Sequence, residues 1–574
     1  MGKTIADSLV EALLNAGVKR VYGIVGDSLN ALIDSIRRSG EIEWIHVRHE
    51  EVAAFAAGSD AEVSGSIAVC AGSSGPGNLH LINGLYDCQR NRVPVLAIAA
   101  HIPSSEIGSN YFQQTRPEHL FKDCSHFCEV IMTPGQMPRT VTMAIQNAVS
   151  NKGVSVVVLP GDVAGLPDST PVPEHVYHVT TPVVHPSDEE LQQLASYLNM
   201  GKRITLLCGS GCAGAHKQLM ELCEKLQSPM VIALRGKEYL EFDNPYLVGL
   251  TGLIGYSSGY HAMMDCDVLL MLGTDFPYRQ FYPEKAVVLQ VDIQKDHLGR
   301  RTPLTYGLCG DVKNTIESLM PLLTESHDSK HLNKCVSDYA EVRKDLDDLA
   351  IGKPGRKPIH PQYLTKVVSD LANEDAIFTA DVGTPTLWGA RYLQMNGKRR
   401  FIGSFNHGTM ANALPQAIGA KVATPNRQVI ALAGDGGLSM LMGDLITLIQ
   451  HKLPVKIVVF NNSALSFVEL EMKAAGYLET GTELVGQNFA NIAKAIGIEG
   501  YRVENPEDLE GVIKQAFTSD APAIVDVVVN RQELSLPPKI TFEQAQGFTI
   551  WMLKAVLNNR GSELIELAKT NLFR

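Results

Sequence analysis

The sequence predicts an α/β protein with three consecutive domains, each a mostly parallel sheet flanked by helices, followed by a C-terminal amphipathic tail. One reason is length: 574 residues are too many for a single hydrophobic core and enough for several α/β domains, and 45% of them are hydrophobic. Another is that short runs rich in β-branched residues alternate with amphipathic helical segments in three successive stretches. Proline-rich composition indicates linkers at 165–190 and 351–361.

This alternation locates the strands and the domain boundaries. We expect a first domain at 1–182, a second at 183–334, a third at 335–531 and the tail at 532–574. The expected strands are 66–70, 95–99 and 154–159 in the first domain, 204–208, 268–272 and 287–291 in the second, and 377–379, 429–433, 456–460 and 523–528 in the third. No sequence repeat is visible.

Composition and charge exclude some partners. A formal net charge of −12 disfavours nonspecific attraction to nucleic acid, so we expect no nucleic acid partner. Ten scattered cysteines without zinc-like spacing indicate free thiols in a reducing cytoplasm. The first residues lack the apolar region of a secretory signal, and no apolar stretch approaches the roughly 18 residues of a spanning helix. We therefore expect a cytoplasmic location.

In the third domain, the segment "ALAGDGGLSM" ends an apolar run with an acid between glycines. Asp435 is followed, after a helix and a second strand, by Asn462. Because a right-handed βαβ unit brings both strand ends to one sheet edge, we expect the two side chains to lie together there. Their oxygens suit Mg²⁺, and Gly434, Gly436 and Gly437 would let a diphosphate approach the backbone. The alternative is two unrelated surface turns.

In the first domain, "EWIHVRHEEVAAFAAGSDA" predicts a strand that ends near Val47 and an alanine-rich helix that begins near Glu50. Glu50 and Glu51 would occupy its first turn, where acids are favoured by the helix dipole alone. The functional alternative is a partly desolvated carboxyl group that exchanges protons with a heteroaromatic ring. The loop "GSSGPGN" at 72–78, at another strand end, supports a ligand site in this domain.

The middle domain contains Gly209, Gly211 and Gly214 in the G-x-G-x-x-G spacing between a strand and a helix. A nicotinamide site needs an acid at the end of the next strand, but "PMVIALRGKEYL" places Arg235 there. We therefore expect a dinucleotide other than NAD. Asp292 and the loop "GTDFPYRQFYP" suit a larger cofactor such as a flavin, although core packing explains the aromatic residues nearly as well.

The C-terminal segment is amphipathic. Its apolar residues at helical spacing are Phe548, Ile550, Trp551, Leu553, Val556, Leu557, Leu564, Ile565, Ala568 and Leu572. Such a tail either docks on its own protein or lies in a membrane interface, and both can hold in turn.

These motifs together resemble the thiamine diphosphate-dependent enzymes. The Gly-Asp-Gly triplet followed by Asn462 is similar to that family's diphosphate motif, and "RHEEVAAFAAGSDA" resembles its segment with the activating glutamate. The likeness also covers "CAGSSGPGNLHLINGLYDC", "TGLIGYSSG", "GSFNHGTMANALPQAIGA" and the tail, so it spans the chain. It is strongest to the bacterial ubiquinone-dependent pyruvate dehydrogenases, also called pyruvate oxidases. One position departs from the resemblance: after Phe112 and Gln113 it implies an acid, and this chain has Gln114 there.

The resemblance implies roles for individual residues. Glu50 would protonate the aminopyrimidine of thiamine diphosphate, with Met410 supporting the bent cofactor and the Gly408 carbonyl near its amino group. The metal ligands would be Asp435, Asn462 and the Ala464 carbonyl, holding Mg²⁺. The implied thiamine diphosphate residues are Glu50, Ser74, Asn406, His407, Gly408, Met410, Asp435, Gly436, Gly437, Asn462, Ser463, Ala464 and Leu465. The implied FAD residues are Gly209, Gly211, Arg235, Thr251, Gly252, Leu253, Ile254, Thr274, Asp275, Phe276, Pro277, Tyr278, Asp292 and Asp311. The residues implied in catalysis are Glu50, Phe112, Gln113, Val382 and Phe467.

The implied reaction is oxidative decarboxylation of pyruvate to acetate and CO₂, with electrons passed through FAD to membrane ubiquinone. Family members place the residues that match Glu50 and Asp435 on different subunits, which implies at least a dimer, and we expect a homotetramer. The tail would bind a phospholipid surface, so the protein would associate reversibly with the inner face of the cell membrane. Acetolactate synthase, phosphate-dependent pyruvate oxidase and a catalytically dead, lipid-responsive flavoprotein stay open as alternatives.

Overall fold

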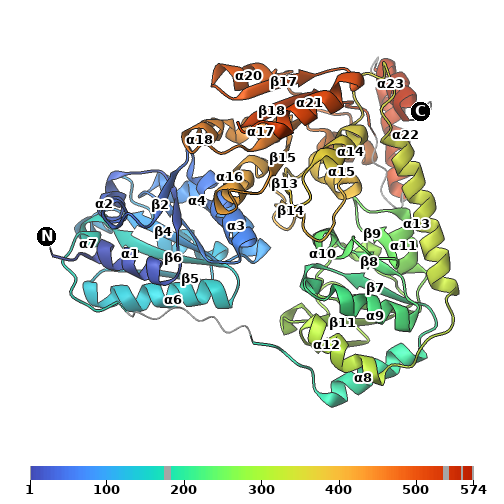
Figure 1. Ribbon diagram of the computed structural model, residues 1–574, viewed down its shortest axis with the longest axis horizontal. Helices are drawn as coiled ribbons and strands as arrows, with labels where there is room; N and C mark the ends of the chain where they lie inside the picture. Colours follow the sequence, from blue (N-terminus) through green and yellow to red (C-terminus); the bar gives the residue numbers. More distant parts are fainter. Residues whose placement is uncertain (1, 173–181, 534–541, 558–559, 572–574) are drawn as a thin grey trace.

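The computed structural model describes residues 2–172, 182–533, 542–557 and 560–571 (Figure 1). Parts of the first predicted linker and of the predicted tail therefore lie outside the described residues, as does Leu572. The described chain contains three six-stranded sheets in which all strand pairs are parallel, flanked by helices. The predicted fold class is confirmed.

The first domain has the strand order β2-β1-β3-β4-β6-β5. Its strands are β1 (Arg20–Gly23), β2 (Glu43–His46), β3 (Ala68–Gly72), β4 (Val95–His101), β5 (Phe127–Val130) and β6 (Val154–Pro160). Its helices are α1 (Ile5–Asn15), α2 (Asn30–Ser39), α3 (Glu50–Ser64), α4 (Pro76–Asn91), α5 (Pro117–Leu120), α6 (Met137–Ser150) and α7 (Gly161–Ala164). Every residue of β3, β4 and β6 is buried, as expected for strands covered on both faces.

One expected strand is displaced. The strand expected at 66–70 begins at Ala68 instead, and ends at Gly72. The reason is the end of α3, where Gly65 takes a left-handed conformation with φ of 69° and the Ser66 N–H donates to the Ser64 hydroxyl. The residues before Ala68 are therefore part of a helix-terminating turn.

The middle domain has the strand order β12-β11-β10-β7-β8-β9. Its strands are β7 (Ile204–Cys208), β8 (Met230–Ile232), β9 (Leu247–Leu250), β10 (Val268–Leu272), β11 (Val287–Asp292) and β12 (Tyr306–Cys309). Its helices are α8 (Asp188–Met200), α9 (His216–Leu226), α10 (Lys237–Leu240), α11 (Ser257–Met264), α12 (Val312–Leu319) and α13 (Lys330–Leu349). This is the doubly wound order of dinucleotide-binding folds, with its switch point between β7 and β10.

The third domain repeats the topology of the first, with the order β14-β13-β15-β16-β18-β17. Its strands are β13 (Ile377–Ala380), β14 (Arg400–Gly403), β15 (Val429–Gly434), β16 (Lys456–Asn461), β17 (Glu499–Val503) and β18 (Ala523–Val528). Its helices are α14 (Pro361–Leu371), α15 (Thr384–Tyr392), α16 (Ala413–Ala423), α17 (Asp435–Leu441), α18 (Leu445–Gln450), α19 (Ser466–Ala474), α20 (Phe489–Ala495) and α21 (Pro506–Thr518). The two outer domains thus share a strand order that no sequence repeat reveals.

Helix α3 of the first domain packs along α16 of the third (Figure 1). Both helices are rich in alanine and almost wholly buried, because each is covered by its own sheet on one side and by the other helix on the opposite side. Gly419 has no side chain at the point where the Ala56 backbone approaches, which allows this close packing. One hydrophobic core therefore continues from the first domain into the third.

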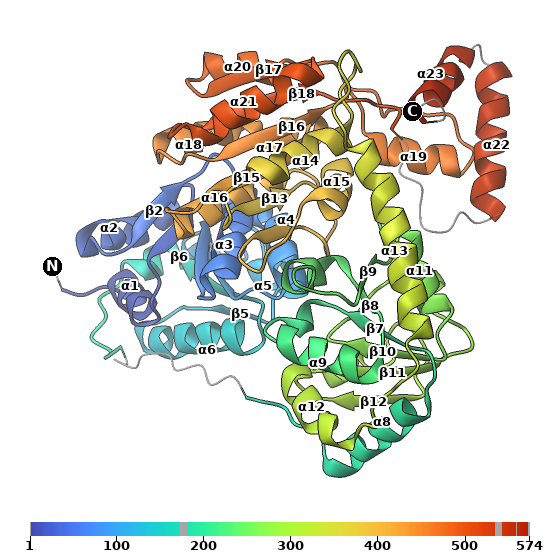
Figure 2. The same ribbon diagram turned by 45° about the vertical axis from the view of Figure 1, so that its right-hand side comes forward.

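Helix α13 runs beside the middle domain toward the third (Figures 1 and 2). The boundary predicted between 334 and 335 lies within this helix. Beyond the last strand, α22 (Phe542–Leu557) and α23 (Gly561–Asn571) follow, and α22 lies beside α19 at the outer edge of the third domain (Figure 2). Of the helices in the described residues, none has the length and apolarity to cross a membrane.

Candidate active site

The third domain brings Asp435 and Asn462 together at the carboxyl edge of its sheet. Strands β15 and β16 are parallel neighbours, and Gly434 at the end of β15 pairs with Phe460 near the end of β16. Asp435 Oδ2 accepts hydrogen bonds from the N–H groups of Asn462 at 3.1 Å and Ser463 at 2.6 Å. Asn462 Oδ1 in turn accepts from the Ala464 N–H at 3.1 Å. The two predicted metal ligands therefore lie together where β15 and β16 end, and we call the two segments that carry them the loop pair.

This loop pair has the donors that a hard cation requires. A carboxylate, the Asn462 amide oxygen and the Ala464 carbonyl are oxygen ligands of the kind Mg²⁺ prefers, and the Asp435 carboxyl is 7% exposed. Burial raises the pKa of Asp435 above its ordinary value, so a nearby cation would relieve a desolvated charge. Over the described ranges no three His, Cys, Asp or Glu side chains gather as a metal site. With one carboxylate, the shell would be completed by phosphate and water oxygens, so these residues fit a metal-bound diphosphate.

Of the glycines around Asp435, Gly436 and Gly437 have close neighbours, whereas an added Cβ on Gly434 would make only ordinary contacts. A Cβ on Gly437 would collide with the Asp381 carboxylate, and one on Gly436 would lie 2.8 Å from Leu465 Cδ2. Asp381, which the sequence analysis did not single out, is buried at the end of β13 and accepts from the N–H groups of Ala413 and Gly434. Burial raises its pKa to about 6. The sequence feature that could have identified Asp381 is an acid directly after a buried strand, the same feature that identified Asp435.

The other third-domain residues implied in cofactor binding or catalysis occupy loops at the same sheet edge. Val382 follows Asp381 after β13 and is half-buried, and Phe467 lies in the first turn of α19. The segment that contains Asn406, Gly408 and Met410 follows β14, with Asn406 and Gly408 exposed. Carboxyl ends of four neighbouring strands thus carry the predicted positions.

The first domain places Glu50 at the start of α3, where its side chain is buried. Glu50 Oε2 lies 2.9 Å from His80 Nδ1 of α4, whose side chain is 44% exposed. Glu51 Oε1 instead accepts a hydrogen bond from the Asn83 amide at 2.7 Å. Among the described contacts, the Glu50 carboxyl has an imidazole nitrogen at hydrogen-bond distance, whereas Glu51 Oε2 lies 4.0 Å from His49 Nδ1. His80 and Asn83 were missed, although their spacing of three on a helix after the "GSSGPGN" loop places them on one face.

The two halves meet within one chain. The Arg48 N–H donates to Asp444 Oδ1 at 2.8 Å, and Asp444 belongs to the segment that follows α17. Asn83 bonds to the Thr409 hydroxyl at 3.3 Å and to His407 Nε2 at 2.8 Å. The segments that carry Glu50 and Asp435 are therefore joined by contacts inside this chain.

The remaining first-domain positions lie on the loops that follow β3 and β4. The Ser74 hydroxyl donates to Gln113 Oε1 at 3.0 Å, and Gln113 has a positive φ of 61°. Phe112 is 78% exposed. Gln114, the departure from the resemblance, accepts the Tyr111 N–H with its own side chain and so closes this turn. Ser74 and Gln113 are brought together, and Phe112 faces solvent.

The middle domain forms a glycine turn at its switch point. The Gly211 N–H donates to the Gly273 carbonyl at 2.9 Å, and a Cβ on Gly211 would lie 2.6 Å from Gly273 Cα. After β9, two strands from β7 in the same sheet, the Thr251 hydroxyl is buried with no hydrogen-bond partner among the described residues, and Gly252 has a φ of 97°. A turn made of glycines and a buried hydroxyl without a hydrogen-bond partner both fit a nucleotide bound at this edge of the sheet.

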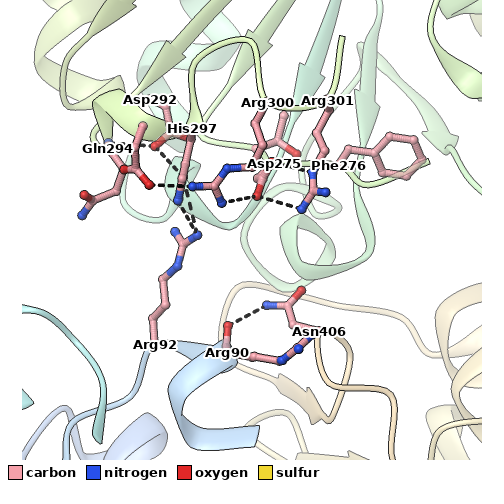
Figure 3. A network of polar contacts seen from close by, with 12 residues as sticks. Arg90, Arg92, Asp275, Phe276, Asp292, Gln294, His297, Arg300, Arg301 and Asn406 are labelled. Carbon is pink, nitrogen blue, oxygen red and sulfur yellow. Dashed lines mark hydrogen bonds and ion pairs between the residues drawn. The ribbon is translucent and has the colours of Figure 1, made fainter. Parts of the chain in front are cut away.

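The acids predicted for FAD are engaged within the chain, and Figure 3 shows this for Asp275 and Asp292. Asp292 Oδ1 lies 3.3 Å from His297 Nδ1, and Arg92 of the first domain donates to the other ring nitrogen of His297 at 3.0 Å. Asp275 pairs with Arg300 and Arg301. Asp311 caps α12 by accepting the Asn314 N–H, and Arg235 reaches the Asn91 carbonyl. These contacts place the end of α4 against the carboxyl edge of the middle domain's sheet.

The loops of the middle domain carry the other predicted FAD positions. Thr274 and Phe276 are buried, whereas Pro277 and Tyr278 are exposed, with the Phe276 and Tyr278 rings 5.5 Å apart. Gly209 packs against Thr274 across the switch point. The half-buried Leu253 and Ile254 lie next to the third domain, since the Arg391 guanidinium donates to the Ile254 carbonyl at 3.1 Å.

Comparison with known proteins agrees with this geometry. The family models described as thiamine pyrophosphate enzyme N-terminal, central and C-terminal domains match residues 3–120, 191–319 and 381–527. The "Putative thiamine pyrophosphate-containing protein YdaP" of Bacillus subtilis is 37% identical over 99% of both chains. Pyruvate oxidase of Lactiplantibacillus plantarum is 30% identical over 92% of this chain and 88% of its own. Acetolactate synthase isozyme 1 large subunit of Escherichia coli is 28% identical over 93% of this chain and 95% of its own.

The three matched segments fall on the three sheets in the order that the fold requires. Glu50 lies in the segment matched by the N-terminal binding domain, and Asp435 and Asn462 lie in that matched by the C-terminal one. The chain therefore belongs to the thiamine pyrophosphate-dependent enzyme family.

Proposed function

We propose that this protein converts pyruvate to acetate and CO₂ and passes the two electrons through FAD to a membrane quinone. The observation that carries the proposal is the position of α4. One face of this helix meets Glu50 through His80, and its C-terminal end meets the dinucleotide edge of the middle domain through Arg92 and Arg235. A site that cleaves a 2-oxo acid and a redox cofactor site thus share one rigid element.

The chain's residues divide the work. Bound thiamine diphosphate supplies the electron sink for decarboxylation. Asp435, Asn462 and the Ala464 carbonyl would hold the Mg²⁺ that neutralises its diphosphate, and Glu50 would hold a proton on the aminopyrimidine. Glu50 is buried against α4, where His80 and Gly77 lie beside its two carboxyl oxygens, which limits the access of bulk water to this group.

The FAD assignment is supported by the glycine turn of the middle domain. The Gly211–Gly273 approach and the unpaired Thr251 hydroxyl suit a dinucleotide, and Arg235 replaces the acid that a nicotinamide site would need. The L. plantarum relative is named a pyruvate oxidase, which agrees with a redox reaction of pyruvate.

The quinone and membrane parts of the proposal are supported by the tail. Exposed apolar residues on its two helices include Leu553, Val556, Leu557 and Ile565, while Trp551 is buried against the third domain. An amphipathic pair with one docked and one exposed apolar face suits reversible adhesion to phospholipid near the inner membrane. We also propose a homotetramer, as the resemblance implies.

Acetolactate synthase activity is the second candidate, because relatives with that name match with nearly the same identity and coverage as the pyruvate oxidase. A phosphate-dependent pyruvate oxidase is the third. The tail favours the quinone-linked reaction over both, since neither soluble activity needs a lipid-binding segment.

Product analysis tests the proposal. Purified protein with thiamine diphosphate, Mg²⁺ and FAD is incubated in air with pyruvate, inorganic phosphate and a quinone analogue, with and without phospholipid vesicles. Acetate with equimolar quinone reduction is expected, and vesicles should accelerate it. Acetolactate without acceptor reduction would establish the synthase instead, and acetyl phosphate with peroxide would establish the phosphate-dependent oxidase.

A further inference from the structure

The buried carboxyl of Glu50 has a single titratable hydrogen-bond partner among the described contacts, and that partner reaches solvent. The Glu50 side chain is 8% exposed, and its Oε2 lies 2.9 Å from His80 Nδ1. The His80 side chain is 44% exposed. The imidazole therefore spans the distance between a buried acid and water.

The ring of His80 is held in place by a second histidine. His49, the N-cap of α3, stacks on it with the ring centroids 4.3 Å apart and the planes 26° from parallel. His49 Nδ1 accepts the Glu51 N–H, so His49 uses this nitrogen as an unprotonated acceptor. Burial first, and then the charge of His80, lowers the pKa of His49. His49 therefore favours the neutral form and holds the His80 ring in place by stacking against it.

The space around Glu50 leaves few other routes for a proton. A Cβ on Gly77 would lie 3.0 Å from Glu50 Oε1. The backbone at the start of α4 therefore packs closely against the second oxygen of the Glu50 carboxyl. The titratable groups that act on this cluster are Glu51 and His49 from α3 and Asp444 from the third domain, and Asp444 is itself completely buried. His49 is itself 35% exposed, but its Nδ1 is engaged by the Glu51 N–H, and among the described contacts none of these three groups forms a hydrogen bond to the Glu50 carboxyl.

We infer that His80 carries the proton of Glu50 to and from water. The inference rests on the proposed function, in which Glu50 loses and regains a proton in each cycle. In the outward direction the O–H bond at Glu50 Oε2 breaks, an N–H bond forms at His80 Nδ1, and the imidazolium releases its Nε2 proton to water. The inward direction reverses these steps and restores the starting tautomer, so the ring does not need to flip.

Two substitutions separate proton transfer from positioning. His80→Asn keeps a donor near the place of Nδ1 and so keeps Glu50 oriented, but it cannot pass a proton on. His80→Ala removes both properties and leaves space for a small molecule. Glu50→Gln is the control for loss of the acid, and His119→Ala is the control for loss of an exposed first-domain histidine.

The measurement is the rate at which the carbon-bound thiazolium proton of thiamine diphosphate exchanges with deuterium, read by quenched-flow NMR without pyruvate. Cofactor affinity is measured alongside by calorimetry. Both His80 variants should slow the exchange by about 100-fold, the lower range of positioned acid–base catalysis, with affinity unchanged. Added imidazole should restore His80→Ala, whereas pyrazole, of the same shape but far weaker as a base, should not.

The outcomes separate this inference from the proposed function. Normal exchange in His80→Asn would show that His80 only orients Glu50, and absence of imidazole rescue in His80→Ala would also overturn the relay. If Glu50→Gln is slow while both His80 variants are normal, the inference falls and the proposed function stands. If the wild-type protein binds no thiamine diphosphate, both fall.

Discussion

The backbone N–H of Arg48 donates to Oδ1 of Asp444 across 2.8 Å, which fixes the chain two residues before Glu50 to the segment that begins at Asp435. The Thr447 hydroxyl donates to the same oxygen at 2.8 Å. Asp444 is 1% exposed, and burial raises its pKa from 3.8 to about 6. A single acid thus connects the two halves of the site at a cost in desolvation.

This connection predicts a pH-dependent stability. The folded protein holds the Asp444 proton between about pH 4 and 6 more tightly than the unfolded chain, so the free energy of unfolding falls as pH rises through that window. Asp444→Asn keeps an acceptor oxygen for Arg48 and removes the charge. We expect the variant to be more stable than wild type at pH 7.5, by at most about 3 kcal/mol, and nearly equal at pH 4.5. Thermal unfolding at both pH values measures this.

A contrary result is informative. If Asp444→Asn is less stable than wild type at both pH values, the ionised carboxylate is stabilised by the Arg48 N–H more than burial opposes it. Asp34→Asn is the matched control, since Asp34 is exposed and makes its ion pairs on the surface of α2.

The second prediction compares the two neighbouring glutamates. Glu50→Gln removes a titratable proton and keeps the shape, so we expect pyruvate decarboxylation to fall by about 100-fold or more while FAD binding persists. Glu51→Gln keeps an oxygen that can accept from Asn83 and removes only a 4.0 Å charge contact with His49 Nδ1, so the loss should be much smaller. Steady-state turnover of both variants measures the difference. Near-normal turnover of Glu50→Gln, with loss in Glu51→Gln, would reverse the assignment.

The third prediction concerns the metal ligands. Asp435 contributes a charge and Asn462 only a dipole, so we expect Asp435→Ala to weaken Mg²⁺-dependent thiamine diphosphate binding about 100-fold or more and Asn462→Ala about tenfold. Calorimetric titration with and without Mg²⁺ measures both affinities. An unchanged affinity in Asp435→Ala would exclude this loop pair as the diphosphate site.

The sequence predicts most of the central strands, although not β1, and few of the edge strands. Strands β4, β6, β15 and β16 are continuous apolar runs because helices cover both faces of each sheet. The strands without a specific expectation include the edge strands β5, β9, β12, β14 and β17. In β5 and β17 exposed and half-buried residues interrupt the apolar pattern, so they resemble loops.

The site shows the same division between local and distant contacts. Asp435 and Asn462 are close because one βαβ unit dictates it, and their sequence spacing was sufficient to predict the pairing. The Glu50–His80 contact depends on how α3 and α4 are rotated against each other. The Arg92–His297 contact depends on how two domains dock (Figure 3). Neither rotation nor docking is encoded in a local residue pattern.

The fourth prediction tests the dinucleotide turn. Gly211→Ala would place a Cβ 2.6 Å from Gly273 Cα, a backbone atom that cannot move alone. Overpacking of this kind costs about 1–3 kcal/mol, so FAD affinity should fall by roughly ten- to a hundredfold, with thiamine diphosphate affinity unchanged. Flavin fluorescence titration measures the loss. Gly135→Ala, where nothing lies within 4 Å of the added Cβ, should bind FAD like wild type. Full FAD affinity in Gly211→Ala would place the cofactor elsewhere.

The last prediction concerns the docked tail. Trp551 is completely buried, with the Phe548 ring centroid 5.2 Å away and the Lys473 ammonium 5.0 Å from its ring. Lys473 pairs in turn with Glu469 and Glu479, so the indole covers a buried charge cluster beside α19.

Trp551→Ala removes the main anchor of this contact. Truncating a buried tryptophan to alanine typically destabilises the packed state by about 3–5 kcal/mol. We expect this loss to exceed the free energy that holds the two short helices on the third domain. We expect α22 and α23 to detach, so that trypsin cleaves near Lys554 faster and the protein binds phospholipid vesicles more strongly than wild type. Limited proteolysis and vesicle flotation measure the two effects.

Leu557→Ala is the matched control, because Leu557 is on the same helix and 82% exposed. It should leave protease resistance unchanged and weaken vesicle binding, since the exposed apolar face is the one offered to lipid. If Trp551→Ala stays protease-resistant and does not float with vesicles, the helix pair is a structural appendage. The preference for quinone-linked oxidation over acetolactate synthesis would then lose its support from the tail and depend on product analysis alone.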